Sequence, residues 1–173
     1  SMTHETDHSG DISGAFQWIW KLDSLGSKLN VIGSYTYMTS GHSSLNAVYY
    51  DNIPEWNSSE ADVVNSRSHN YTLQGDWTER MKNGWCLSAG SKYSVTERKN
   101  NTWIYNENAS FAGLSYSEKI LSGYAMLEKQ LGKVDVTMGL RAENSCVRKK
   151  ESGDGDPLKR HYTYLLPDVT VAY

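Results

Sequence analysis

The stretch from Val134 to Asn144, VDVTMGLRAEN, decides the fold class. Apolar side chains occupy every second position, at Val134, Val136, Met138, Leu140 and Ala142. The positions between them hold Asp135, Thr137, Gly139, Arg141 and Glu143. Successive side chains of an extended strand point to opposite faces of a sheet, so the pattern predicts a strand with one apolar and one charged face. A helix would scatter these charges through its core.

Alternating runs earlier in the chain predict two hairpins. The first hairpin is expected over residues 12–37, with its turn at 23–27. The second is expected over residues 65–95, and its turn contains Asn83-Gly84, a dipeptide that favours tight hairpin turns. Both hairpins place Trp and Tyr on the same parity as most of their aliphatic residues.

The remaining strands follow the second hairpin. Residues 116–130 carry apolar groups on both parities, which favours a strand covered on both sides. A tight turn at 131–133 leads into the 134–144 strand, and residues 161–173 are expected to form the last strand. No helix longer than a turn is predicted. The predicted fold class is therefore all-β, an antiparallel up-and-down meander of about seven to ten strands.

The connections between the predicted strands fall into two classes. The three short turns alternate with polar stretches, and we expect long loops at 40–64, 97–115 and 148–159. Every second connection of a meander lies at the same end of the sheet, so the long loops gather at one end. Short periplasmic turns and long extracellular loops are typical of outer-membrane barrels. We therefore expect a partial or small closed β-barrel of outer-membrane type.

The aromatic residues support a membrane setting independently. The chain contains 12 Tyr and 6 Trp but only 2 Phe, a balance that favours rings with a polar group. Trp77 and Trp85 lie next to a short turn, whereas Tyr71 and Tyr93 lie toward the expected long loops. The height from Trp85 to Tyr93 is roughly 20 Å, close to the apolar band between the two aromatic girdles of a barrel. We expect this parity to face lipid.

Composition excludes several other classes of function. A net charge of -3 gives no reason to expect a nucleic-acid partner. No run of apolar residues is long enough for a transmembrane helix. Cys86 and Cys146 fall on opposite parities, so we expect no disulfide between them. Neither a catalytic group nor a cofactor-binding motif is predicted, and the chain is not expected to be an enzyme.

The segment from Leu114 to Ser145 carries a more specific pattern, LSYSEKILSGYAMLEKQLGKVDVTMGLRAENS. Its motif residues are Tyr116, Glu118, Gly139, Leu140, Arg141 and Glu143. One further motif residue, Pro167, follows downstream of the segment. With this pattern the chain resembles the outer-membrane β-barrel family related to TonB-dependent receptors, over most of its length after residue 11. Leu166 stands where the family has an aromatic residue before the proline.

The resemblance implies a location in the cell outer membrane of a Gram-negative envelope. It implies part of a receptor that takes up a nutrient, with outer-membrane lipid and an inner-membrane energy-coupling protein as partners. Full barrels of this type have about 22 strands. We therefore expect residues 1–11 to be a cloning remnant with a flexible polar lead-in, and residues 12–173 to be one segment excised from a larger barrel. Exposed sheet edges would invite edge-strand pairing or a homodimer.

Charged residues of the opening stretch have two interpretations. Arg141 and Glu143 share a face and could belong to a substrate path, or they could be lumen ion pairs that satisfy one another, which we favour. Glu118 is interpreted in the same way, as a diagonal partner of Arg141. Pairing about the 131–133 turn predicts that Arg141 lies near Gly123 and Glu143 near Leu121.

Two short motifs are interpreted as coincidences of composition. Residues 4–8 read H-E-x-x-H, a zinc signature that requires both histidines on one face of a helix, and no helix is predicted there. The acidic run 151–156 lacks the ligand spacing of a calcium loop. No metal site is predicted. The alternative to a membrane barrel is a soluble, lipocalin-like β-barrel that binds a small apolar ligand, with Met138 and Leu140 facing inward.

Overall fold

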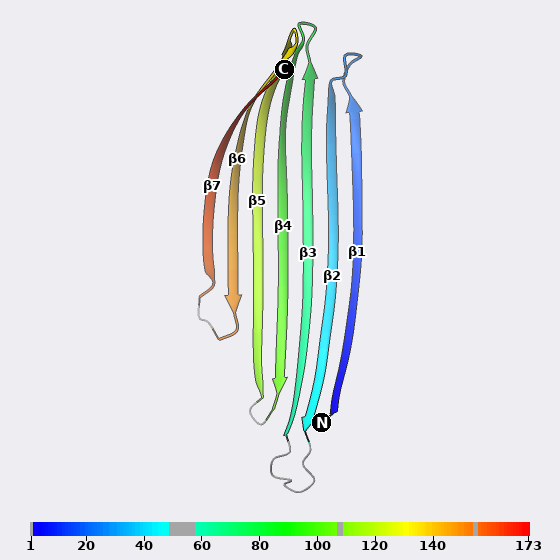
Figure 1. Cartoon of the computed structure of the whole chain (residues 1–173), viewed down its shortest axis with the longest axis vertical. Helices are drawn as coiled ribbons and strands as arrows, with labels where there is room; N and C mark the ends of the chain where they lie inside the picture. The colour runs from blue at the N-terminus through cyan, green and yellow to red at the C-terminus, as the bar shows by residue number, and fades with distance from the viewer. Residues whose placement is uncertain (1, 49–57, 107–108, 154–155) are drawn as a thin grey trace.

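Seven antiparallel strands form one sheet in the computed structural model, which describes residues 2–48, 58–106, 109–153 and 156–173. Neighbouring strands in the sheet follow one another in the chain, from β1 to β7 (Figure 1). The strands are β1 (Met2–Lys21), β2 (Lys28–Val48), β3 (Ser58–Arg80), β4 (Trp85–Tyr105), β5 (Ser110–Leu131), β6 (Val134–Glu151) and β7 (Leu158–Ala172). The all-β meander is confirmed, and the described sheet is open because β1 and β7 do not pair with each other.

The strands are longer than the sequence pattern indicated. They contain between 15 and 23 residues, whereas a strand needs about 9–11 residues to cross a bilayer. The loop expected at 97–115 is wrong in extent, because β4 and β5 stay paired out to Ile104 and Ser110. The loops expected at 40–64 and 148–159 are also shorter, and residues 49–57 and 154–155 lie outside the described residues. The backbone hydrogen bonds between strands continue through polar segments whose composition is typical of loops.

The start of the chain is also part of the sheet. Residues 2–11, expected to be a flexible lead-in, belong to β1 and pair with residues 38–47 of β2. The polar residues there show no amphipathic alternation, so a strand was not detectable from their pattern. Their backbone groups nevertheless complete the ladder along the outer half of β2.

The turns at one end are tight. Two residues, Gly132 and Lys133, connect β5 to β6, and Gly132 adopts a positive φ of 67°. This turn sets Arg141 opposite Tyr124 and Glu143 opposite Ser122. The expected register was therefore wrong by one residue, because a two-residue turn centres the hairpin between two residues and not on one.

The β1–β2 turn is organised by Asp23. One carboxylate oxygen accepts hydrogen bonds from the backbone N–H groups of Leu25, Gly26 and Ser27, at 2.9, 3.0 and 2.9 Å. The Ser27 hydroxyl donates to the other oxygen at 2.7 Å and accepts from the N–H of Arg80 at 2.9 Å. Ser27 is fully buried. The turn is thereby tied to the end of β3.

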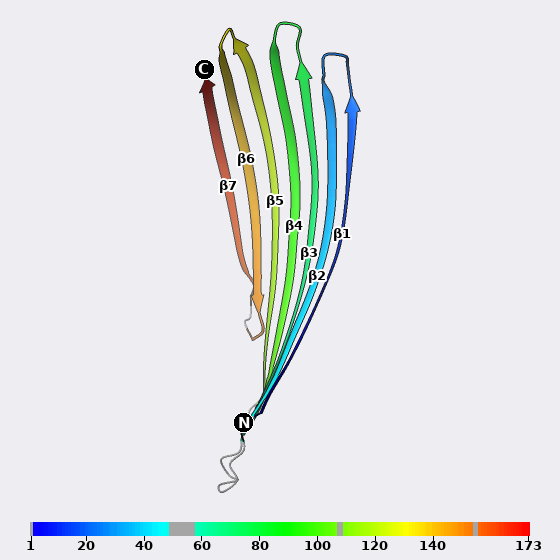
Figure 2. The same cartoon turned by 45° about the vertical axis from the view of Figure 1, so that its right-hand side comes forward.

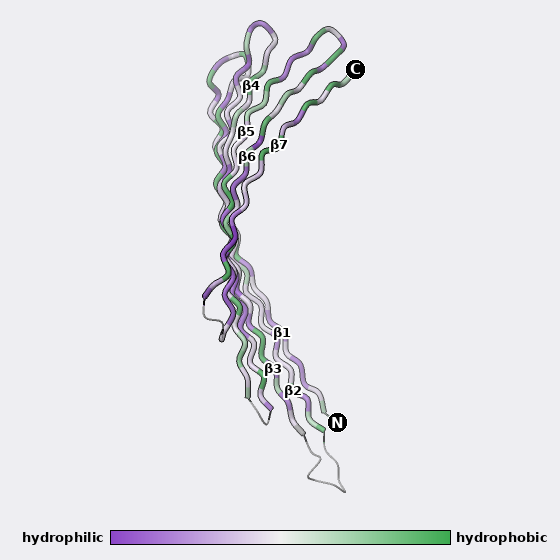
Figure 3. Tube along the Cα trace, turned by 90° about the vertical axis from the view of Figure 1, so that its left-hand side faces the viewer, coloured by the Kyte–Doolittle hydropathy of each residue, from purple (hydrophilic) through white to green (hydrophobic). Residues whose placement is uncertain are grey.

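The sheet separates its side chains into two faces. We call apolar the face with the odd-numbered residues of β2–β5 and β7 and the even-numbered residues of β1 and β6. The opposite face, with Asp76 and Arg141, is called the polar face. Figure 2 and Figure 3 show a single twisted layer with nothing packed on either side. Most of the exposed large hydrophobic side chains lie on the apolar face, such as Leu121, 55% exposed, and Val169, 69% exposed.

The sheet has no packed core of its own. Ala47 is the single buried hydrophobic residue among those the structure describes. No helix in the described residues is long and apolar enough to cross a membrane. The area on the apolar face must be covered from outside the sheet, because burial of apolar area is the main force that stabilises a fold.

The Asp23 turn gives a testable pH dependence. Hydrogen bonds, first of all from the Ser27 hydroxyl, lower the pKa of the Asp23 carboxyl from its ordinary value of 3.8. A carboxyl with a lowered folded-state pKa contributes stability that is present above its unfolded value and is lost as the pH falls through the folded value. We expect the hydrogen-exchange protection of the Leu25, Gly26 and Ser27 amides to fall below pH 3.8. The control Asp23→Asn, which has an uncharged acceptor, should show a flat profile, and identical profiles would contradict the assignment.

Candidate functional site

The most developed side-chain network lies on the polar face and crosses three strands. The hydroxyl of Tyr124 on β5 donates a hydrogen bond to Asp76 on β3 at 2.9 Å. The side-chain amide of Gln74 donates to the other oxygen of the same carboxylate at 2.8 Å. Tyr124 must pass over β4 to reach Asp76, and the residue of β4 paired with both is Gly90.

Gly90 is required by this crossing. A Cβ atom at that position would stand 2.6 Å from Asp76 Oδ1, 2.6 Å from Tyr124 Cε1 and 2.8 Å from the carbonyl oxygen of Gly75. These distances are well inside van der Waals contact, and one of the three groups is backbone. The missing side chain therefore makes room for the aromatic ring. The sequence analysis missed this network. The available signal was a glycine inside a predicted strand on the polar parity, which often marks a close approach of another group.

The charged residues of the opening strand form a local pair. Arg141 Nη2 lies 2.8 Å from Glu143 Oε2, two residues along β6 on the polar face. The predicted partnership of Arg141 with Glu118 is wrong. Glu118 is paired with Val147 of β6, whereas the residue paired with Arg141 is Tyr124. Glu118 and Tyr124 are six residues apart along β5. No described carboxylate other than that of Glu143 forms an ion pair with Arg141.

The other motif residues divide between the two faces. Tyr116 and Glu118 lie on the polar face toward the outer ends of the strands, opposite Lys149 and Val147. Gly139 also lies on the polar face, but a Cβ there would meet its nearest atoms at an ordinary 3.8 Å. Leu140 and Pro167 are directly paired across β6 and β7 on the apolar face. Their functional importance stays a prediction.

The H-E-x-x-H motif lies on a strand. His4, Glu5 and His8 all belong to β1, where Glu5 points to the face opposite to the two histidines. Four residues of strand separate the histidines by about 13 Å, too far for both to bind one ion. No group of three potential metal-ligating side chains is present in the described ranges. The two cysteines are free and lie on opposite faces, as their parities predicted.

Aromatic residues mark two levels of the apolar face. Trp77 pairs with Leu29 near the tight turns. Farther along the same strands, the rings of Tyr35 and Tyr71 lie 4.9 Å apart, and those of Tyr37 and His69 lie 4.8 Å apart. The two levels correspond to the aromatic girdles at the boundaries of a membrane barrel. The polar face is then directed to the lumen.

A comparison with known families agrees with this arrangement. Residues 20–173 match the outer membrane protein β-barrel family. The chain belongs to this family. The predicted location in the outer membrane and the resemblance to the family related to TonB-dependent receptors are thereby confirmed, whereas the soluble lipocalin-like alternative is wrong.

Solved structures with the same fold are outer-membrane proteins of much greater length. The ferric preacinetobactin receptor BauA from Acinetobacter baumannii has 10% identity and a TM-score of 0.60, over 96% of this chain and 28% of that chain. The RagAB peptide transporter has 9% identity and a TM-score of 0.56, over 86% and 20%. The unliganded ferric citrate transporter FecA has 12% identity and a TM-score of 0.53, over 85% and 25%. The chain thus spans about a quarter of the length of these proteins, and no curated protein matches it.

The network on the polar face predicts unequal effects of two glycine substitutions in this barrel segment. Gly90→Ala should lower the free energy of unfolding by about 1–3 kcal/mol, because the new methyl group clashes with Tyr124, Asp76 and backbone. Gly139→Ala on the same face should change it by less than about 0.5 kcal/mol. Urea unfolding in phospholipid vesicles, followed by tryptophan fluorescence, measures both. Equal effects would contradict the crossing.

The two faces can be tested at adjacent residues. After replacement of both native cysteines by serine, Leu140→Cys and Arg141→Cys are each labelled with an environment-sensitive fluorophore. Lipids brominated on their acyl chains should quench the label at residue 140 several-fold more than the label at residue 141, because quenching requires contact with the acyl chain. The reverse order would show that the lumen and lipid faces are exchanged.

Proposed function

We propose that this sheet is part of the wall of a larger outer-membrane barrel that takes up a nutrient with energy from an inner-membrane partner. One observation carries the proposal: the sheet is open, its polar face holds the hydrogen-bond network around Asp76, and the apolar side chains of its other face are exposed. The fold is shared with a transporter and a receptor that are more than three times as long. A transport role, and not catalysis, fits a face built from hydroxyl, amide and paired charged groups.

The edges of the sheet support a larger barrel. The outward backbone groups of β1 and β7 have no strand beside them in the described sheet. In lipid each unpaired N–H or C=O group costs several kcal/mol. Further strands of the same barrel satisfy both edges at once. A homodimer through these edges is a second way to cover them, and it would require both edges of each copy to pair.

The polar face offers a surface for a hydrophilic substrate. A hollow of about 310 Å³ lies there, lined among others by Asp11, Met38, Ser66, Ser68 and Arg98. These side chains come from the outer halves of β1 to β4. In the proposed barrel the hollow lies on the lumen side, near the entrance, so a substrate meets hydroxyl groups and an arginine first.

Energy-dependent uptake is the decisive measurement. Cells that carry the full-length protein should accumulate a labelled nutrient, and a deletion strain should not. A protonophore should abolish accumulation but leave binding at the cell surface intact, because only the inward step requires the inner-membrane partner. Arg98→Gln should weaken surface binding several-fold, whereas Lys92→Gln on the same face and strand, outside the hollow, should not.

Two outcomes would contradict the proposal. Accumulation that is insensitive to the protonophore would indicate a passive pore. Equal accumulation by the deletion strain would indicate that the protein does not transport the tested nutrient class. A panel of ferric chelates, peptides and oligosaccharides covers the chemical classes large enough to require a barrel of this width.

A further inference from the structure

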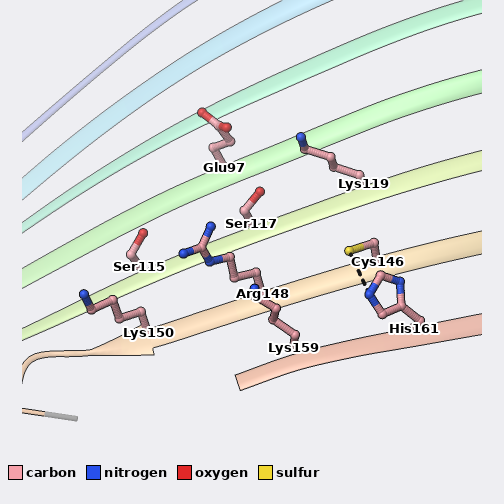
Figure 4. A pocket seen from close by; sticks show the side chains of 9 residues that line it. All are labelled: Glu97, Ser115, Ser117, Lys119, Cys146, Arg148, Lys150, Lys159 and His161. Atoms are coloured by element: carbon pink, nitrogen blue, oxygen red, sulfur yellow. Dashed lines mark hydrogen bonds between the residues drawn. The ribbon is translucent and has the colours of Figure 1, made fainter. Parts of the chain in front are cut away.

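A hollow lies on the face opposite to the lumen network. It measures about 560 Å³ and is lined by Glu97, Ser115, Ser117, Lys119, Cys146, Arg148, Lys150, Lys159 and His161. Figure 4 shows these side chains on four adjacent strands, β4 to β7. Every one of them falls on the apolar parity. The hollow is therefore on the outer wall of the barrel and not on the path of a substrate.

Its height relative to the aromatic level is fixed by the register. Tyr71 is paired with Val95 and His69 with Glu97, in the two rows of the outer aromatic level. The Tyr71 row continues across the sheet to Lys119 and His161, and the His69 row continues to Arg148, which is paired with Lys159. Both rows of cations therefore belong to the outer aromatic level itself, at the boundary of the apolar band. This is the layer of the lipid headgroups.

The hollow is strongly basic. Lys119, Arg148, Lys150 and Lys159 contribute four cations, and Glu97 is the one carboxylate in the lining. None of the four cations forms an ion pair with a carboxylate of the described residues. Adjacent uncompensated cations repel one another unless an anion binds between them. Lys149, one residue along β6 on the polar face, is by contrast paired with Glu151.

We propose that this hollow binds the phosphate group of a lipid headgroup in the outer leaflet. The bare apolar face below it continues directly into the acyl-chain region, so the two surfaces match the two ends of one lipid. A guanidinium offers a planar fork for phosphate oxygens, and the neighbouring ammonium groups add charge. Ser115 and Ser117 supply hydroxyl donors at the floor of the hollow. The proposal rests on the barrel orientation, and it is independent of uptake.

A matched pair of double variants tests the site in the purified full-length protein. Arg148→Gln with Lys159→Gln removes two cations from the hollow. Lys149→Gln with Arg160→Gln removes two cations from the same strands at the same height, but on the polar face. Binding of acyl-labelled phosphatidic acid in dodecyl maltoside micelles is measured by fluorescence anisotropy, with phosphatidylcholine as the reference lipid.

The first double variant should weaken phosphatidic acid binding by about tenfold or more, because each basic residue near an anionic lipid surface contributes substantially. The control pair should retain the affinity, and phosphatidylcholine binding should not change. Arg148→Lys with Lys159→Arg keeps both charges and should restore tight binding, which separates loss of charge from loss of folding. High salt should weaken binding in the unmodified protein.

Three outcomes would overturn the proposal. An equal loss in both double variants would indicate a general charge effect. Displacement of the lipid by inorganic phosphate over the same concentration range would indicate a site for a free anion. Tight binding retained by the first double variant would place the lipid elsewhere. Because the readout is lipid binding, failed uptake with intact lipid binding would overturn only the proposed transport function.

Discussion

The continuous ladder of backbone hydrogen bonds is the constraint on which the rest of the structure depends. Hydrocarbon offers no partner for an N–H or C=O group, so a membrane sheet must satisfy these groups internally. Here six successive antiparallel pairings do so along nearly the whole length of each strand. The ladder also fixes the parity of every residue, and it leaves β1 and β7 as the two places where the structure requires a neighbour.

Parity is the property that the sequence predicted best. The alternation of VDVTMGLRAEN correctly separated Leu140 from Arg141, because a strand has a period of two whatever surrounds it. The same reasoning placed Cys86 and Cys146 on opposite faces. The ends of the strands were not predictable in this way, since the outer halves carry Asn, Ser and Thr on both parities. Such residues favour turns by their local hydrogen bonding, and only the pairing with an adjacent strand shows that they are extended.

The geometry of the polar face required more than parity. The Tyr124 to Asp76 hydrogen bond depends on two registers at once, across β4 and β5 and across β3 and β4. An error of one residue in either register moves Gly90 out from under the ring, and the register expected for the β5–β6 hairpin was in error by that amount. Glu118 was wrongly paired with Arg141 for a different reason, because it lies six residues along β5 from Tyr124, too far for a diagonal contact. The motif residues were recognisable in the sequence, but their partners depended on the two-residue turn at Gly132.

The pairing of the outer halves of the strands fixes the positions of charged side chains on both faces. If residues 97–105 and 148–151 were loops, the cations of β5, β6 and β7 would have no fixed spacing and would form no common surface. Because these residues are paired strands, each cation stands in a defined row at the outer aromatic level and on a defined side of the wall. One sheet can therefore present paired charges to the lumen and unpaired cations to the surroundings at the same level. The unpaired set lies at the outer aromatic level of the apolar face, where an anionic group attached to an apolar chain fits both surfaces.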